Sequence, residues 1–290
     1  MIRFDYANDE VVCEVDVRDR LPVYLDNDAI IELSKGPDKR RARFVSAIRA
    51  RGTLVFSLAN AAEIGGPQGA SGEAVRAFLD SIGACWAPLE LNPWKAVEKE
   101  ERGEWQRATI SERFVTSYFQ QRAYEQSPGG SRLLNLDADH FFRLSAIAEW
   151  SLDPRAGVSA QAAQLDAELV KTVANARAEF EADPATLDRR WPPIGFDSKR
   201  AATFALVHLM RLLVFEAKSR TLKKNDGLDL CHTVLASSTA ALASLDKHWK
   251  GRVLRLPTPN ELARVFYRPE LDELVEALEA AVNELVASPT

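Results

Sequence analysis

Cysteine and histidine are scarce in this chain, which holds three cysteines and four histidines among its 290 residues. Cys13, Cys85 and Cys231 are far apart, odd in number and surrounded by apolar residues, as is typical of small buried side chains. Neither a zinc knuckle nor a disulfide framework is therefore indicated. The chain also lacks a glycine-rich phosphate loop and a serine elbow, so these signatures of nucleotide binding and acyl transfer are missing.

Long hydrophobic runs are missing as well. The most apolar stretch, residues 203–215, is short and is interrupted by His208 and Arg211, and no charged segment leads into an apolar run at the start. We therefore expect a cytoplasmic protein with no membrane association. With 46% hydrophobic and 27% charged residues, the chain can bury a full core in one large domain or two small ones.

The net charge of −5 argues against a protein whose whole surface binds nucleic acid. Two basic clusters are nevertheless present, at residues 35–51 and 218–224. A solvated helix face is the commoner explanation for such a run, but both clusters lie close in sequence to acidic candidates. The residues that we expect to contact a phosphate backbone are Lys39, Arg40, Arg41, Lys223 and Lys224.

The pattern of hydrophobic residues predicts an α/β fold with alternating strands and helices. Residues 2–17 alternate around a polar turn, which predicts a β-hairpin. Residues 93–221 are rich in helix formers and show no convincing strand, which predicts a helical insertion. The predicted core strands are 21–25, 54–56, 84–89, 243–245 and 253–256. The predicted helices around them are 37–50, a short helix after Ser57, 73–82, 227–240 and 269–287. The last of these helices has one apolar stripe, which more often packs on its own domain than forms a dimer seam.

Two carboxylates follow early strands. Asp26 ends the strand at 21–25, and a parallel sheet gathers its ligand site at the carboxyl ends of its strands. Its structural alternative is a helix N-cap, which Asp28 could supply just as well. Glu63 shares a helical face with Asn60, three residues earlier, and Ser57 is placed to cap that helix. For an isolated glutamate, a surface position would be the commoner explanation.

Two further carboxylates follow the predicted insertion. Asp226 can cap a helix with Asp229 in its first turn, and capping alone could explain both. His232 lies one turn beyond Asp229 and could either touch substrate or pack in the core. Asp246 directly follows another strand and repeats the position of Asp26. Carboxylates brought together repel unless they are neutralised, and Mg²⁺ or Mn²⁺ accepts such hard oxygen ligands.

At these residues the chain resembles the PIN domain family of metal-dependent nucleases. Residues 23–28 are similar to the family's opening strand with its first aspartate, and residues 57–64 to its glutamate helix. Residues 226–232 and 244–247 are similar to its third and fourth acidic positions, with Ser244 where the family often has threonine. The resemblance covers about half of the chain.

The resemblance implies a three-layer α/β/α sandwich with a central parallel sheet, an Mg²⁺ or Mn²⁺ site, and cleavage of single-stranded RNA. It assigns catalysis and metal binding to Asp26, Glu63, Asp229 and Asp246, with Asp28 and Asp226 as accessory ligands. Ser57, Asn60 and His232 would orient water or ligands behind them. A toxin-like ribonuclease is one form of this function, and its protein partner would be a second copy of the chain or an antitoxin-like protein.

The resemblance also predicts the domain boundaries. A hairpin over 1–20 precedes a catalytic domain of two segments, 21–92 and 222–257, which the helical insertion 93–221 separates, and a C-terminal helix occupies 258–290. Glu63 and Asp229 are 166 positions apart, much further than in compact toxin ribonucleases. The insertion must therefore leave the sheet or cap the site.

Two alternatives remain open from the sequence. A haloacid-dehalogenase-like phosphatase would use Asp26 as a covalent nucleophile and Asp28 as its acid, but it leaves Glu63 and Asp246 without a role. The other alternative is an inactive PIN scaffold that serves as a binding or regulatory protein. Retention of all four acids counts against a decayed site.

Overall fold

The structure is a computed structural model, and it describes residues 2–7, 10–15, 17, 19–65, 72–111, 118, 143–153, 156–216 and 222–287. Parts of the predicted helical insertion, at 112–117, 119–142, 154–155 and 217–221, lie outside these residues, as does the turn of the predicted hairpin at 8–9.

The predicted α/β class is confirmed. A five-stranded parallel sheet has the strand order β5-β4-β3-β6-β7, and helices flank it. A separate pair, β1 (Ile2–Ala7) and β2 (Glu10–Val15), is antiparallel, as the predicted hairpin requires. The chain divides into two compact units. Unit 1 holds residues 1–89, 110–159 and 268–290, and unit 2 holds 90–109 and 160–267.

Unit 1 contains the strands β3 (Leu21–Leu25), β4 (Gly52–Ser57) and β5 (Trp86–Leu89), paired in parallel with β4 in the middle. All six residues of β4 are buried, as expected for a central strand covered on both faces. The helices of unit 1 are α1 (Asn27–Lys35), α2 (Asp38–Ala50), α3 (Leu58–Gly65), α4 (Gly72–Ile82), α8 (Leu144–Ser151) and α14 (Leu271–Ala287), and a 3₁₀ turn, η6 (Arg268–Glu270), precedes α14.

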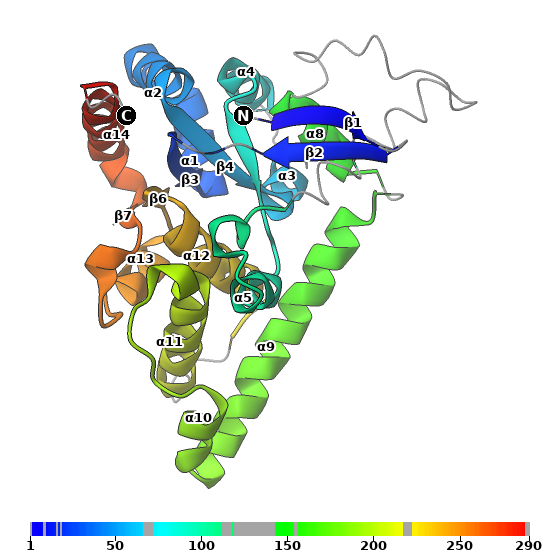
Figure 1. The fold of residues 1–290 in the computed structure, drawn as a ribbon, viewed down its shortest axis with the longest axis vertical. Coiled ribbons are helices and arrows are strands. Elements are labelled where there is room, and N and C mark those ends of the chain that lie inside the picture. Colours follow the sequence, from blue (N-terminus) through cyan, green and yellow to red (C-terminus); the bar gives the residue numbers. More distant parts are fainter. Residues whose placement is uncertain are drawn as a thin grey trace. The chain divides into compact units, whose positions relative to one another are not determined.

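Helix α14 packs along α2, and the two helices lie side by side in Figure 1. Its stripe is buried at Leu274, Val275 and Leu278, while Leu285 near its end is exposed. Arg43 on α2 also donates two hydrogen bonds to the carboxylate of Glu279, of 2.9 and 2.5 Å. The expectation that this helix packs on its own domain is confirmed.

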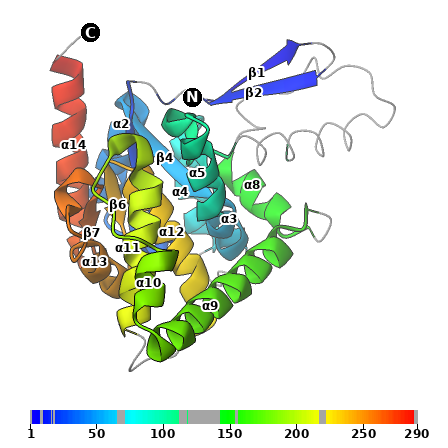
Figure 2. The same ribbon diagram turned by 60° about the horizontal axis from the view of Figure 1, so that its bottom comes forward.

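Unit 2 contains the parallel strands β6 (Leu242–Ser244) and β7 (Arg264–Phe266). Helix α11 packs against both α5 and α12 (Figure 2). The helices of unit 2 are α5 (Pro93–Glu101), most of α9 (Val158–Ala182), α10 (Ala185–Arg190), α11 (Ala201–Glu216), α12 (Asp226–Thr239) and α13 (Lys247–Val253). Its 3₁₀ turns are η2 (Trp105–Arg107), η4 (Ser198–Arg200) and η5 (Pro259–Glu261).

Two helices of unit 2 are capped at their N-termini by buried carboxylates from other helices. Glu100 accepts hydrogen bonds from the backbone N–H groups of Ala202 and Thr203, at 2.8 and 2.9 Å, at the start of α11. Asp166 on α9 likewise accepts hydrogen bonds from backbone N–H groups at the start of α12. The first backbone N–H groups of a helix have no partner within it, so a buried carboxylate there satisfies donors and matches the helix dipole.

Three local predictions are wrong or displaced. Residues 253–256 are not a strand, because Val253 ends α13 and a turn follows; the next strand is β7. The N-cap of α12 is Asn225 rather than Asp226. Of the cysteines, Cys231 is buried as predicted, Cys85 is half-buried, and the side chain of Cys13 lies outside the described residues.

In the described part of the chain, no helix is both long and apolar enough to cross a membrane. The predicted catalytic domain joins residues 21–92 to 222–257, and these segments fall largely in different units. That domain boundary stays a prediction.

Candidate functional site

Asp26 stands at the carboxyl end of β3 and begins the helix that follows. The residue is extended, and its Oδ1 accepts a hydrogen bond of 2.8 Å from the N–H of Ala29. Asp26 is therefore the N-cap of α1, whereas the sequence left this role open to Asp28. Asp28 lies exposed in the first turn of α1, with a carboxylate oxygen 3.9 Å from Arg268.

A network of polar side chains surrounds the start of α3 in unit 1. Ser57 Oγ accepts from the N–H of Asn60 at 3.1 Å, and Asn60 Oδ1 accepts from the N–H and the Oγ of Ser57, at 3.0 and 2.9 Å. This reciprocal arrangement is a capping box with asparagine in the third helical position. The predicted capping role of Ser57 is confirmed.

The same asparagine extends the network to Glu63. Asn60 is completely buried, and its side-chain amide donates to Asn27 Oδ1 at 3.0 Å. Asn27 in turn donates its amide to the exposed carboxylate of Glu63. The side chain of Asn27 thus accepts a hydrogen bond from Asn60 through its oxygen and donates one to Glu63 through its nitrogen. Sequence reasoning missed Asn27, although its position directly after Asp26 was a signal.

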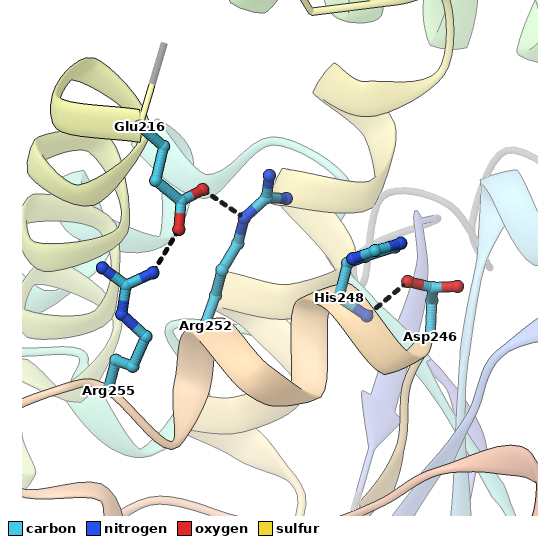
Figure 3. A network of polar contacts seen from close by, with 5 residues as sticks. All are labelled: Glu216, Asp246, His248, Arg252 and Arg255. Atoms are coloured by element: carbon cyan, nitrogen blue, oxygen red, sulfur yellow. Dashed lines mark hydrogen bonds and ion pairs between the residues drawn. The ribbon is translucent and has the colours of Figure 1, made fainter. Parts of the chain in front are cut away.

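Asp246 repeats in unit 2 what Asp26 does in unit 1. It follows β6 after one residue, and its Oδ1 accepts a hydrogen bond of 2.7 Å from the N–H of His248, which caps α13. Figure 3 shows this contact. The carboxylate is exposed. Both strand-end aspartates are therefore N-caps, a structural role that the sequence had offered as the alternative for Asp26.

Asp229 lies in an acidic environment. Burial raises the pKa of its carboxyl to about 6; a hydrogen bond from Trp249 opposes this, and the carboxylates of Asp226, Asp246 and Asp166 add to it. Although the side chain is exposed, dense protein around it limits hydration of the charge. Unit 2 thus brings Asp229 and Asp246 within electrostatic reach of each other.

The other acids of this cluster are engaged by backbone groups. Asp226 accepts from the N–H of Lys223 at 2.7 Å. Asp166 is buried and accepts from the N–H groups of Asn225, Gly227 and Leu228, at 3.0, 2.9 and 3.2 Å. Sequence reasoning missed Asp166, because it lies inside a helical segment some 60 positions from the helix it caps.

His232 is buried in α12, and burial lowers its pKa to about 4. The imidazole is therefore neutral near pH 7. Of the two roles considered for it, a neutral side chain in the core of unit 2 agrees with this environment, and a substrate contact stays a prediction.

The candidate phosphate-binding residues differ in the contacts that their side chains make within the protein. Arg41 donates to the carbonyl oxygen of Ser34 at 2.8 Å and to Asp38 at 2.5 Å, and Arg40 lies 3.5 Å from Asp272. The remaining candidates, which are exposed, are Lys39, Lys223 and Lys224.

Among the residues that the structure describes, no group of three or more His, Cys, Asp or Glu side chains meets the spacing of a metal site.

No protein family model, no curated protein and no solved structure matches this chain.

Proposed function

We propose that this protein is a metal-dependent endoribonuclease that hydrolyses phosphodiester bonds of single-stranded RNA. Its acidic residues would be Asp26, Glu63, Asp229 and Asp246. The observation that carries the proposal is that Asp26 and Asp246 each cap the helix that follows a strand of the parallel sheet, the end at which such a sheet gathers its ligand site. Asp229 adds to this, because it has three neighbouring carboxylates. Carboxylates that oppose each other's charge are the donors that a divalent cation neutralises.

The donor set fits Mg²⁺ or Mn²⁺, because all the proposed ligands are hard carboxylate oxygens. When bound, such an ion would activate a water molecule and stabilise the oxygen that leaves phosphorus. Asp28 and Asp226 would be accessory ligands. Asp28 lies beside Arg268, and Asp226 already accepts a backbone N–H, so each has a competing partner.

The chain's own residues would orient the acids. Capping fixes the side-chain torsion of Asp26 and of Asp246, because one oxygen of each is tied to its helix. Ser57, Asn60 and Asn27 would hold Glu63 through the hydrogen-bonded relay described above. Supporting hydrogen bonds of this kind fix ligand orientation, and their loss usually weakens metal binding.

RNA would be held through its phosphate backbone by the exposed lysines Lys39, Lys223 and Lys224. Arg40 and Arg41 would contribute less, because their guanidinium groups already face Asp272 and Asp38. The proposed place of action is the cytoplasm. If the protein is a toxin, its induction should stop cell growth, and an antitoxin-like protein or a second copy of the chain would be its partner.

The test is hydrolysis by the wild-type protein and its Asp26→Asn variant. Asparagine is as good an N-cap as aspartate, so this variant removes the charge and keeps the start of α1. Asp38→Asn, at an exposed acid of α2, is the matched control. Each protein is incubated with a pool of single-stranded RNA and with p-nitrophenyl phosphate, in Mn²⁺ or in EDTA.

RNA cleavage that needs Mn²⁺ and Asp26, and is retained in the Asp38→Asn control, is the expected result. Turnover of p-nitrophenyl phosphate alone would replace the proposal with the phosphatase. Silence toward both substrates would leave the binding or regulatory protein as the function to pursue.

A further inference from the structure

The strands β1 and β2 form a sheet of their own, separate from the five-stranded sheet, and they lie side by side in Figures 1 and 2. Among the strands that the structure describes, β1 pairs with β2 alone, so its other edge has no strand beside it. Every second residue of an edge strand directs its backbone N–H and C=O groups outward, and such an edge is a template for another strand. β1 contains no proline, so each of its residues keeps the N–H that pairing needs.

The register of the hairpin sorts its residues into two faces. Residues directly opposite each other in an antiparallel pair share a face, and the two faces alternate along each strand. The pairs on the hydrophobic face are Ile2 with Val15, Phe4 with Cys13 and Tyr6 with Val11. The other face holds the charged residues, where Arg3 is opposite Glu14 and Asp5 is opposite Val12. An isolated two-stranded hairpin is marginally stable in water, so an amphipathic hairpin of this kind is stabilised by further strands.

The order of charges along β1 makes the strand complementary to itself. When two copies of β1 run antiparallel with Phe4 opposite Phe4, Arg3 of each copy stands opposite Asp5 of the other. Opposite charges directly across two strands stabilise the pair, and a twofold axis produces this contact twice. Ile2 then stands opposite Tyr6, so the hydrophobic faces of the two hairpins join on one side of the sheet.

Other pairings lack these features. Centring the pair on Arg3 or on Asp5 sets like charges opposite each other. A pairing with Phe4 opposite Arg3 or Asp5 places the hydrophobic face of one copy on the charged side of the other. β2 carries charge of one sign only, at Glu10 and Glu14, so its edge has no self-complementary pairing of this kind.

We propose that the free edge of β1 is a dimerisation edge, at which a second copy of this chain adds its own β1. The result is an antiparallel sheet with the order β2-β1-β1-β2 about a twofold axis. The partner is a second copy because the charges of β1 match its own sequence read in the opposite direction. This inference goes beyond the proposed function and does not depend on it, since the hairpin contains none of the proposed catalytic acids.

Asp5→Arg tests the dimerisation edge, because it sets arginine opposite Arg3 at both ends of the pair and keeps the hairpin's own pair of Arg3 and Glu14. Glu10→Arg is the matched control, with the same change of charge on the same face but on β2, opposite Ala7. We expect the wild type to dimerise and Asp5→Arg to raise the Kd of the dimer about 10-fold or more, because two attractive pairs become repulsive. Glu10→Arg should dimerise as the wild type does. Sedimentation velocity over a series of concentrations measures all three.

A complementary variant tests the register. Arg3→Glu combined with Glu14→Arg keeps opposite charges within the hairpin but sets two acids opposite each other across the dimer, so this variant should also dimerise weakly. In a mixture with Asp5→Arg, both opposed pairs are again of opposite sign, and a heterodimer should form. Formation of the heterodimer would also show that both variants fold.

Three results would overturn the proposal. A wild type that stays monomeric at every concentration would leave the free edge of β1 to a strand of another protein. A dimer that Asp5→Arg leaves as tight as the wild type would place the contact between copies elsewhere. Two weakened variants that form no heterodimer when mixed would refute the pairing of Arg3 with Asp5.

Discussion

Gly227 occupies a crowded position at the start of α12. A Cβ there would lie 2.7 Å from the carbonyl oxygen of Asp166, 2.9 Å from its Oδ1 and 3.0 Å from the Cβ of Leu169. The nearest obstacle is backbone, which cannot move aside as the end of a flexible side chain can. The glycine is therefore required by the close approach of α9.

Gly227→Ala should lower the free energy of unfolding by about 2 kcal/mol, the usual cost of overpacking a filled site. Gly251→Ala is the matched control, because a Cβ on that residue of α13 meets nothing within 4 Å. Alanine is the better helix former, so the control should gain up to about 1 kcal/mol. Urea denaturation measures both, and equal effects of the two changes would contradict the close approach.

Asp166 is the second residue on which the start of α12 depends. Removal of its carboxylate in Asp166→Ala would leave three backbone N–H groups without their acceptor, and two of these groups, on Gly227 and Leu228, are buried. We expect a loss of about 2 kcal/mol or more. Glu168→Ala, on the exposed face of α9, should cost under about 0.5 kcal/mol, since its carboxylate accepts a hydrogen bond from the exposed Gln164. Comparable melting temperatures for the two variants would refute the capping role.

At the scale of elements, α12 carries two titrating groups, Asp229 and His232, whose pKa shifts change the free energy of unfolding in opposite directions as the pH rises. The pKa of Asp229 is raised from 3.8 to about 6, so its favourable contribution to stability is present below pH 4 and is lost as the pH rises through 6. The pKa of His232 is lowered from 6.5 to about 4, so its contribution is present above pH 6.5 and is lost as the pH falls through 4. In the wild type the two trends oppose each other.

Single substitutions should separate the trends. In EDTA, Asp229→Asn should be more stable than the wild type at pH 7, by about 1 kcal/mol after allowance for the exposure of the carboxylate, and the gain should vanish near pH 4. The difference between His232→Gln and the wild type should move in the variant's favour on acidification from pH 7 to pH 4. Denaturation series at several pH values measure both, and parallel profiles would contradict the two shifts.

Most elements were predictable because their hydrophobic pattern is local. The three strands of unit 1 and the helices around them follow from short apolar runs, caps and glycines. The predicted strand at 253–256 failed because Val253 is the buried last residue of α13 and a turn follows, in which Leu254 is exposed. The strand β7 was missed because three residues are too few to show a period.

At the scale of the whole molecule, the exposed lysines should determine binding to RNA. Lys39→Ala should weaken binding to all single-stranded sequences and reduce the slope of log K against log salt by about 1. Arg41→Ala should change that slope less, because its guanidinium already bonds Asp38 and Ser34. Filter binding between 50 and 200 mM salt, about the range in which such effects are large, compares the two. Equal slopes would contradict the assignment.

The candidate site was predictable only in part. The sequence pointed to the strand-end positions of Asp26 and Asp246, because each follows a short apolar run. It could not show Asn27 holding Glu63 or the Asp166 carboxylate accepting from Gly227 at the start of α12, because these contacts join residues that are 36 and 61 positions apart. Long-range hydrogen bonds of this kind leave no periodic pattern in a sequence.

The central claim is that Asp26 and Asp246 bind a divalent cation, and Mn²⁺ affinity tests it most directly. Isothermal titration would compare the wild type with Asp26→Asn and Asp246→Asn, both of which keep their helix caps. We predict that each single change weakens binding about 10-fold or more. Mn²⁺ binding that survives Asp26→Asn unchanged, or an absence of binding in the wild type, would contradict the claim.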